Sequence, residues 1–108
     1  MTRDVFNNIV ERRLSLIKVI LVKKGEEYST EDDVFHNFNA ATGLSFHKSR
    51  EKVAWEFAVK HFQSIKDILD KTENEEFEVS APMIEEKLGD AINYLILIEG
   101  MLKNRLNK

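Results

Sequence analysis

The spacing of apolar residues predicts that the chain is built from helices. Between Val5 and Lys24 apolar side chains recur every three or four residues, which places them on one face of a helix: Phe6, Val10, Leu14, Ile17 and Leu21. The stretch Leu14 to Val22 is apolar on nearly every side, so a buried strand competes with the helix there. The length of the whole pattern favours the helix, and Gly25 is its expected end.

Two more helices are predicted in the middle of the chain. A short one should run from Glu31 to Ala41, because a serine and a threonine before it are each followed three residues later by an aspartate, the spacing of a helix cap. After a turn that contains Gly43, a long helix should run from Lys48 to Lys71. Its expected buried stripe consists of Ala54, Trp55, Ala58, Phe62, Ile65 and Leu69.

The last predicted helix begins at Pro82 and ends near Leu106, and it has two apolar faces. The main stripe consists of Ile84, Leu88, Ala91, Ile92, Leu95 and Leu102. A second stripe is polar at its start and apolar at its end, and it consists of Glu86, Asp90, Asn93, Leu97 and Met101. A helix that is apolar on two sides needs two partners, so we expect it at the centre of a bundle or at a subunit interface.

Residues 71–80 are acidic and weakly patterned, and we expect them to form a mobile loop. With 108 residues and little proline or glycine, the chain is expected to be one all-α domain, residues 1–108. The simplest architecture is an antiparallel four-helix bundle with three long helices and one short helix.

Composition narrows the chemistry. Without cysteine, the chain offers no disulfide, no thiolate zinc site and no cysteine nucleophile, so only oxygen and imidazole ligands remain. The net charge of -3, with both signs interspersed, predicts no binding to duplex nucleic acid or to an anionic membrane. No stretch approaches the roughly 18 apolar residues of a membrane span, and we expect a cytoplasmic protein.

Acidic residues form two candidate metal sites. Glu86 and Asp90 are four residues apart on one helical face, and a divalent cation such as Mg²⁺ would offset the repulsion between them. The competing interpretation is a solvated acidic first turn of the helix, but the continuation of this stripe into Leu97 favours a face that meets protein. The second candidate is the junction 24–33 with five acids, of which Glu27 is preferred as a ligand, although ordinary helix capping would also explain them.

Two histidines could contact a nucleotide. His61 lies at the edge of the apolar stripe of its helix, where it either contacts a phosphate or a base or forms a hydrogen-bonded, partly buried imidazole. His36 lies beside Asn37 and between two phenylalanines, where it could stack on a base.

Four segments together resemble phage and prophage proteins of the nucleotide modification associated domain type, which are similar to MazG-like all-α nucleoside triphosphate pyrophosphohydrolases. The segments are KGEEYS at 24–29, Asn37-Phe38, the helix 58–69, and EKLGDAINYL at 86–95. The resemblance covers roughly residues 15–102 and implies a four-helix unit that forms dimers or tetramers and binds nucleotides with Mg²⁺. MazG-like enzymes hold the ions with a Glu-x-x-Glu pair and a Glu-x-x-Asp pair. This chain has Glu86-x-x-x-Asp90 instead and no Glu-x-x-Glu in its first helix.

The function predicted from the sequence is a Mg²⁺-dependent nucleotide pyrophosphohydrolase that releases a monophosphate and pyrophosphate. The expected catalytic and metal-binding residues are Glu27, Glu86 and Asp90, and the expected substrate contacts are Lys24, Tyr28, His36, Asn37, His61 and Asn93. The alternative is a non-catalytic helical module that binds a host or defence protein, which the missing Glu-x-x-Glu pair supports. A structural oligomer without a ligand is the third possibility.

Overall fold

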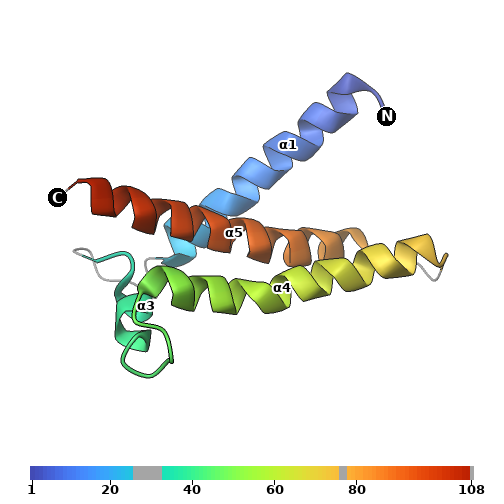
Figure 1. Ribbon diagram of the computed structural model, residues 1–108. Helices are drawn as coiled ribbons and strands as arrows, with labels where there is room; N and C mark the ends of the chain where they lie inside the picture. The colour runs from blue at the N-terminus through green and yellow to red at the C-terminus, as the bar shows by residue number, and fades with distance from the viewer. Residues whose placement is uncertain (26–32, 76–77, 108) are drawn as a thin grey trace.

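The computed structural model in Figure 1 describes residues 1–25, 33–75 and 78–107, and its regular elements are all helical. They are α1 (Arg3–Ile17), the π-helix η1 (Lys18–Lys24), α3 (His36–Ala41), α4 (Arg50–Glu73) and α5 (Ala81–Leu106). Within the described residues there is no strand, so the predicted all-α class is confirmed. No described helix is both long enough and apolar enough to cross a membrane.

Side-chain hydroxyls fix where three of the helices begin. Thr2, Ser49 and Ser80 each precede a helix and accept a hydrogen bond from a backbone N–H in its first turn, at 3.2 to 3.3 Å. Such a cap satisfies one of the backbone donors that a helix start leaves unpaired. Pro82 lies in the first turn of α5, where it costs no backbone hydrogen bond. The predicted starts and ends of α4 and α5 are correct to within two residues.

The first predicted helix changes its geometry partway along. The segment from Val5 to Lys24 is helical throughout, so the competing strand over residues 14–22 is wrong. From Lys18 to Lys24, however, the helix is of the wider π type. π-Helical turns are rare and are often found at functional sites.

The two connections also differ from the sequence prediction. Residues 31 and 32 lie outside the described part, and the following residues form a turn, so that α3 begins at His36 and not at Glu31. The Asp33 carboxylate stabilises this turn, because it accepts hydrogen bonds from the Phe35 N–H at 3.0 Å and from the Asn39 amide at 2.8 Å. The acidic loop expected at 71–80 begins later, because α4 continues to Glu73. Residues 76–77 are outside the described part, and the mobility of the loop stays a prediction.

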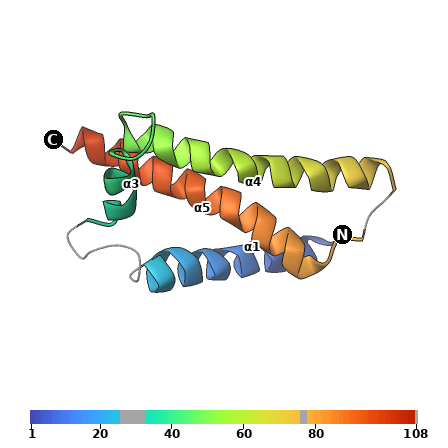
Figure 2. The ribbon, with the colours of Figure 1, turned by 90° about the horizontal axis from the view of Figure 1, so that it is seen from below.

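The two longest helices, α4 and α5, lie side by side and antiparallel in both views (Figures 1 and 2) and share the most extensive contact in the chain. The short helix α3 packs near the N-terminal end of α4. Few apolar side chains are fully covered, and three of them are alanines: the buried set is Phe35, Val53, Ala54, Ala58, Ala91 and Met101.

On α5 the apolar end of the second stripe is covered, whereas the main stripe is buried at Ala91 but exposed further along the helix. Met101 is fully buried and Leu97 packs against the core. On the stripe expected to be the main one, Leu95 is 46% and Leu102 is 52% exposed. On α4, Trp55 was likewise expected to be buried and is 52% exposed. These side chains are exposed because a single copy of the chain has too few helices to cover both faces of α5 and the outer side of α4.

Helix α1 is held to the rest of the chain mainly by polar contacts. The Arg12 guanidinium makes two hydrogen bonds to the Glu85 carboxylate, at 3.0 and 3.1 Å, and Arg13 donates to the Glu85 carbonyl at 3.2 Å. Figure 1 shows the N-terminal half of α1 extending away from α4 and α5. None of its side chains is buried. Its apolar stripe is therefore exposed, at 40 to 50% for Val5, Phe6, Ile9, Val10 and Leu14.

The chain has more surface than a compact domain of its size. Its accessible area is 8450 Å², whereas a folded 12.6 kDa monomer is expected to expose roughly 6,200 Å², an excess of about 2,200 Å². The radius of gyration is 16.2 Å, against about 13 Å for a compact domain of about 100 residues. The excess is explained by α1 and by the uncovered outer faces of α4 and α5.

Candidate functional site

An apolar cavity of about 720 Å³ lies where η1, α3, α4 and α5 meet. The π-helical segment forms one wall, with Ile20, Leu21, Val22 and the adjoining Gly25. The remaining lining residues come from the turn before α3 and from the other three helices: Val34, Asn37, Phe38, Phe57, Asp90, Asn93, Tyr94 and Leu97. A volume of this size lies within the usual range for small-molecule sites, which are mostly apolar with a few polar groups.

One residue that lines this cavity has a buried polar atom without a partner. The side-chain oxygen Oδ1 of Asn93 is buried, and within the described part of the chain it accepts no hydrogen bond. A buried acceptor without a donor costs about 1–3 kcal/mol, so such groups usually bind water or a ligand. Asn37 and Asp90 line the same cavity and supply a second amide and a carboxylate.

Aromatic rings form the centre of the site. Phe38 meets Tyr94 edge to face, with ring centroids 6.3 Å apart and planes at 81°, and it lies 6.3 Å from Phe57. The His61 ring stacks on Tyr94, with centroids 5.2 Å apart and an angle of 25°. The Nδ1 atom of His61 is 3.5 Å from Oδ2 of Asp90. Tyr94 is thus packed between α3 and a histidine that also faces Asp90, the only carboxylate among the described lining residues.

The pKa of Tyr94 reflects the burial and the charge around the cavity. Burial raises the pKa of its phenol above the ordinary value of 10.0, because the charged phenolate is poorly solvated there. The Asp90 carboxylate raises the pKa further by repulsion. The surroundings of Tyr94 therefore disfavour added negative charge and suit a neutral ring.

Metal-binding groups are sparse in the described residues. No cluster of three or more histidine, aspartate or glutamate side chains among them could hold a metal ion. Glu86 lies one helical turn before Asp90, and its side chain is 65% exposed and 3.9 Å from the Lys87 ammonium. It does not line the cavity. Glu27, the third predicted ligand, lies outside the described residues.

The residues singled out from the sequence are partly brought together. Asn37, Asp90 and Asn93 line one cavity, and His61 contacts it through Tyr94 and Asp90. His36 is exposed and is not in the lining. Lys24 is the last residue of η1, next to the lining residue Gly25, and Tyr28 lies outside the described part.

Three aromatic residues of the site were not selected from the sequence. Phe38 was expected to be ordinary core, and Tyr94 and Phe57 carried no signal of their own. Tyr94 directly follows Asn93, a member of the second stripe, so its place in the sequence was an indirect signal that it lies near the site. Its pairing with His61 depends on the packing of α4 on α5, which residue spacing within one helix does not indicate.

Comparison of the chain with protein-family models, curated proteins and solved structures found no match. The resemblance to MazG-like proteins therefore stays a prediction, and the site has to be interpreted from its own geometry.

The environment of Tyr94 can be tested by titration. In a Tyr28→Phe variant Tyr94 is the only tyrosine, and we expect its ultraviolet absorbance to report a pKa above 10.0. Adding Asp90→Asn should lower that pKa, whereas Asp70→Asn, which changes an exposed carboxylate on α4, should not. Because the folded state holds the proton more tightly than the unfolded state, stability should fall as the pH rises from about 10 through the folded-state pKa. A Tyr94 pKa at or below 10.0 would contradict the described burial.

Proposed function

We propose that the chain is a nucleotide-binding protein whose cavity between η1, α3, α4 and α5 holds the base. The observation that carries the proposal is the buried, unpartnered Oδ1 of Asn93 in a cavity with aromatic walls. A nucleobase offers a planar apolar face together with N–H donors at its edge. It would therefore pack against the rings and satisfy the orphan acceptor in one orientation.

In this proposal the two amides of the cavity contact the base, and the carboxylate lies nearer the sugar and phosphates. The amides of Asn37 and Asn93 each offer a donor and an acceptor, which suits the mixed edge of a base. Phe38 and Tyr94 provide the ring surfaces against which the base packs. Asp90 would lie toward the sugar and phosphates, because its side chain is 39% exposed and so reaches the mouth of the cavity.

We further propose that the bound nucleotide is a triphosphate and that the reaction is its Mg²⁺-dependent hydrolysis to a monophosphate and pyrophosphate. Asp90 and Glu86 are one helical turn apart on α5, and Mg²⁺ commonly takes one or two carboxylates together with substrate phosphates. Glu27 and Lys24 would complete the site, as the resemblance to MazG-like enzymes implies. The ion would neutralise phosphate charge and lower the pKa of an attacking water. His61, 3.5 Å from Asp90, would fix the orientation of that carboxylate.

Mutations on α5 can separate base binding from metal binding. Asn93→Leu removes the unpartnered acceptor at similar volume, so the ligand-free protein should become more stable by about 1 kcal/mol, while nucleotide affinity should fall at least about tenfold. Asp90→Asn should abolish Mg²⁺-dependent binding and turnover, while the ligand-free protein melts at the same or a higher temperature. Binding by equilibrium dialysis, with and without Mg²⁺, and pyrophosphate release by phosphorus NMR measure the two effects.

Asp70→Asn is the matched control, because it removes an exposed carboxylate that is paired with Lys66 on α4. It should leave binding and turnover unchanged. The metal assignment is wrong if Asp90→Asn retains full Mg²⁺-dependent binding. Nucleotide binding without pyrophosphate release would keep the cavity assignment and remove the hydrolase.

A second copy of the chain is proposed to cover the exposed helices. The excess surface of about 2,200 Å² per chain amounts to about 4,400 Å² for two chains, which lies within the roughly 2,000–5,000 Å² that obligate homodimers bury in total. The uncovered area includes the apolar stripe of α1 and the outer stripe of α5. Two chains could complete a four-helix bundle that one chain leaves open. A shortage of helices within the chain thus supports the predicted dimer or tetramer.

An interaction module for another protein is the second candidate, because the same apolar surface would suit a foreign helix. The oligomeric state distinguishes the two, since a chain that pairs with itself leaves this surface covered.

Sedimentation velocity at tens of micromolar should show a dimer or a larger oligomer. Phe6→Asp places a charge on the apolar stripe of α1 and should shift the distribution toward monomer. Asn8→Asp adds the same charge to the polar side of α1 and should leave the oligomer intact. A stable monomeric wild-type protein would contradict the homo-oligomer and favour the interaction module.

A further inference from the structure

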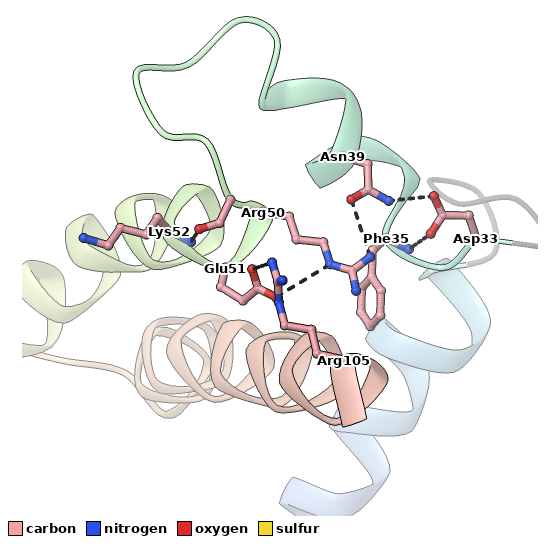
Figure 3. A network of polar contacts seen from close by, with 8 residues as sticks. Asp33, Phe35, Asn39, Arg50, Glu51, Lys52 and Arg105 are labelled. Carbon is pink, nitrogen blue, oxygen red and sulfur yellow. Dashed lines mark hydrogen bonds and ion pairs between the residues drawn. The ribbon is translucent and has the colours of Figure 1, made fainter. Parts of the chain in front are cut away.

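A second cavity, of about 300 Å³, lies beside the C-terminal end of α3. Figure 3 shows this region, where α3, the start of α4 and the end of α5 come together. The described side chains that line it are all polar or charged: Asn39, Thr42, Lys48, Ser49, Arg50, Asn104 and Arg105. Three of these seven carry a positive charge and none of the seven carries a negative charge. Within the described part of the chain the two cavities share no lining residue.

Of the two arginines in this lining, Arg105 is the one that forms a short, two-bonded ion pair with a carboxylate. Its Nε and Nη2 atoms donate to the two carboxylate oxygens of Glu51, at 2.5 and 2.8 Å. This pair joins the end of α5 to the start of α4, and Figure 3 shows the two side chains facing each other. The hydrogen bonds from Arg105, more than any other cause, lower the pKa of Glu51 to about 2. Glu51 is therefore ionised and largely committed to Arg105.

Arg50 is more buried and less well compensated. Its side chain is only 14% exposed, and its guanidinium lies over the Phe35 ring at 4.8 Å from the centroid. Its contact with Glu51 is 3.9 Å long and goes to an oxygen that already accepts from Arg105. Its hydrogen bond to the Asn39 side chain is long as well, at 3.5 Å.

Asp33 is the other carboxylate near this guanidinium, and the charge of Arg50 contributes to a lowered pKa for Asp33. The larger cause of that lowering is a hydrogen bond from Asn39, and Asp33 also accepts from the Phe35 N–H. The five N–H donors of a guanidinium suit planar, bidentate binding of an anion. A largely buried cation with only long polar contacts is stabilised when such an anion binds.

Lys48 adds a third charge to the rim of the cavity. Its side chain is exposed and forms no ion pair or hydrogen bond with any other residue in the described ranges. Three cations, from the loop before α4, from α4 and from α5, therefore line one cavity, and the two described carboxylates near it, Glu51 and Asp33, are already engaged.

We propose that this cavity binds a phosphate group, either as inorganic phosphate or as the phosphate monoester of a small molecule. The donors come from three separate elements, which suits a tetrahedral anion with oxygens in several directions better than a planar carboxylate. A volume of 300 Å³ lies at the lower end of the range for small-molecule sites, so the ligand is small. The inference stands apart from the proposed nucleotide site, because among the described residues the two cavities have no lining residue in common.

Calorimetric titration with inorganic phosphate, at constant ionic strength, tests the assignment. We expect saturable binding that Lys48→Gln weakens by about fivefold or more, since one charge-assisted contact is lost. Lys52→Gln is the matched control: Lys52 follows on the same helix, does not line the cavity, and points away from Arg50 in Figure 3. It should change the affinity by less than about twofold. Arg50→Lys keeps the positive charge but removes the planar guanidinium that can bind an anion through two N–H groups, so it should also weaken binding.

Further experiments distinguish inorganic phosphate from a phosphate monoester, and the basic cavity from the nucleotide site. A phosphate monoester that binds more tightly than inorganic phosphate identifies the larger ligand, and equal affinity identifies the free ion. Asp90→Asn should leave phosphate affinity unchanged, so a failure of the nucleotide proposal does not affect this result. The inference is overturned by an absence of phosphate binding at millimolar concentration, by equal losses in the two lysine variants, or by acetate that binds as tightly as phosphate.

Discussion

The close approach of α4 and α5 is the contact on which the rest of the structure depends. Small side chains favour this contact, because three of the buried residues of the two helices are alanines: Ala54 and Ala58 on α4 and Ala91 on α5. Interaxial distance depends on the side chains at the contact, and alanines allow helices to lie near each other. The same shortage of large buried side chains means that this contact alone cannot provide a large hydrophobic stabilisation. The proposed association with a second copy would add to this burial.

The position of α3 follows from this helix pair. Phe35, which precedes α3, is buried against α5 at Gly100, where an added Cβ would lie 3.0 Å from the ring. A side chain at this position would therefore press on the ring, and glycine leaves room for its close approach to the helix backbone. With Phe35 fixed, Asn37 and Phe38 of α3 line the aromatic cavity, while Asn39 and the C-cap Thr42 line the basic cavity. One short helix thereby contributes to two chemically different sites.

The sequence predicted the helical class and the ends of α4 and α5, because hydroxyl caps and Pro82 act locally. It also placed Asp90 and Asn93 on a shared face, which the cavity confirms as a common location. It could not indicate which of the two stripes of α5 is covered within one chain, because that depends on where α3 and α4 pack. The basic cavity was missed for the same reason: Arg105 is 55 or more residues away from Lys48 and Arg50, and no local pattern links α4 to the end of α5.

Incomplete burial in one chain is the central claim, and it has a thermodynamic consequence. If folding and association are coupled, the folded state gains stability by mass action and its unfolding midpoint depends on protein concentration. Urea unfolding followed by circular dichroism over a hundredfold range of protein concentration tests this directly. The account predicts that the midpoint rises steadily with concentration. A midpoint that is the same at every concentration would show that the chain is stable alone and would contradict the account.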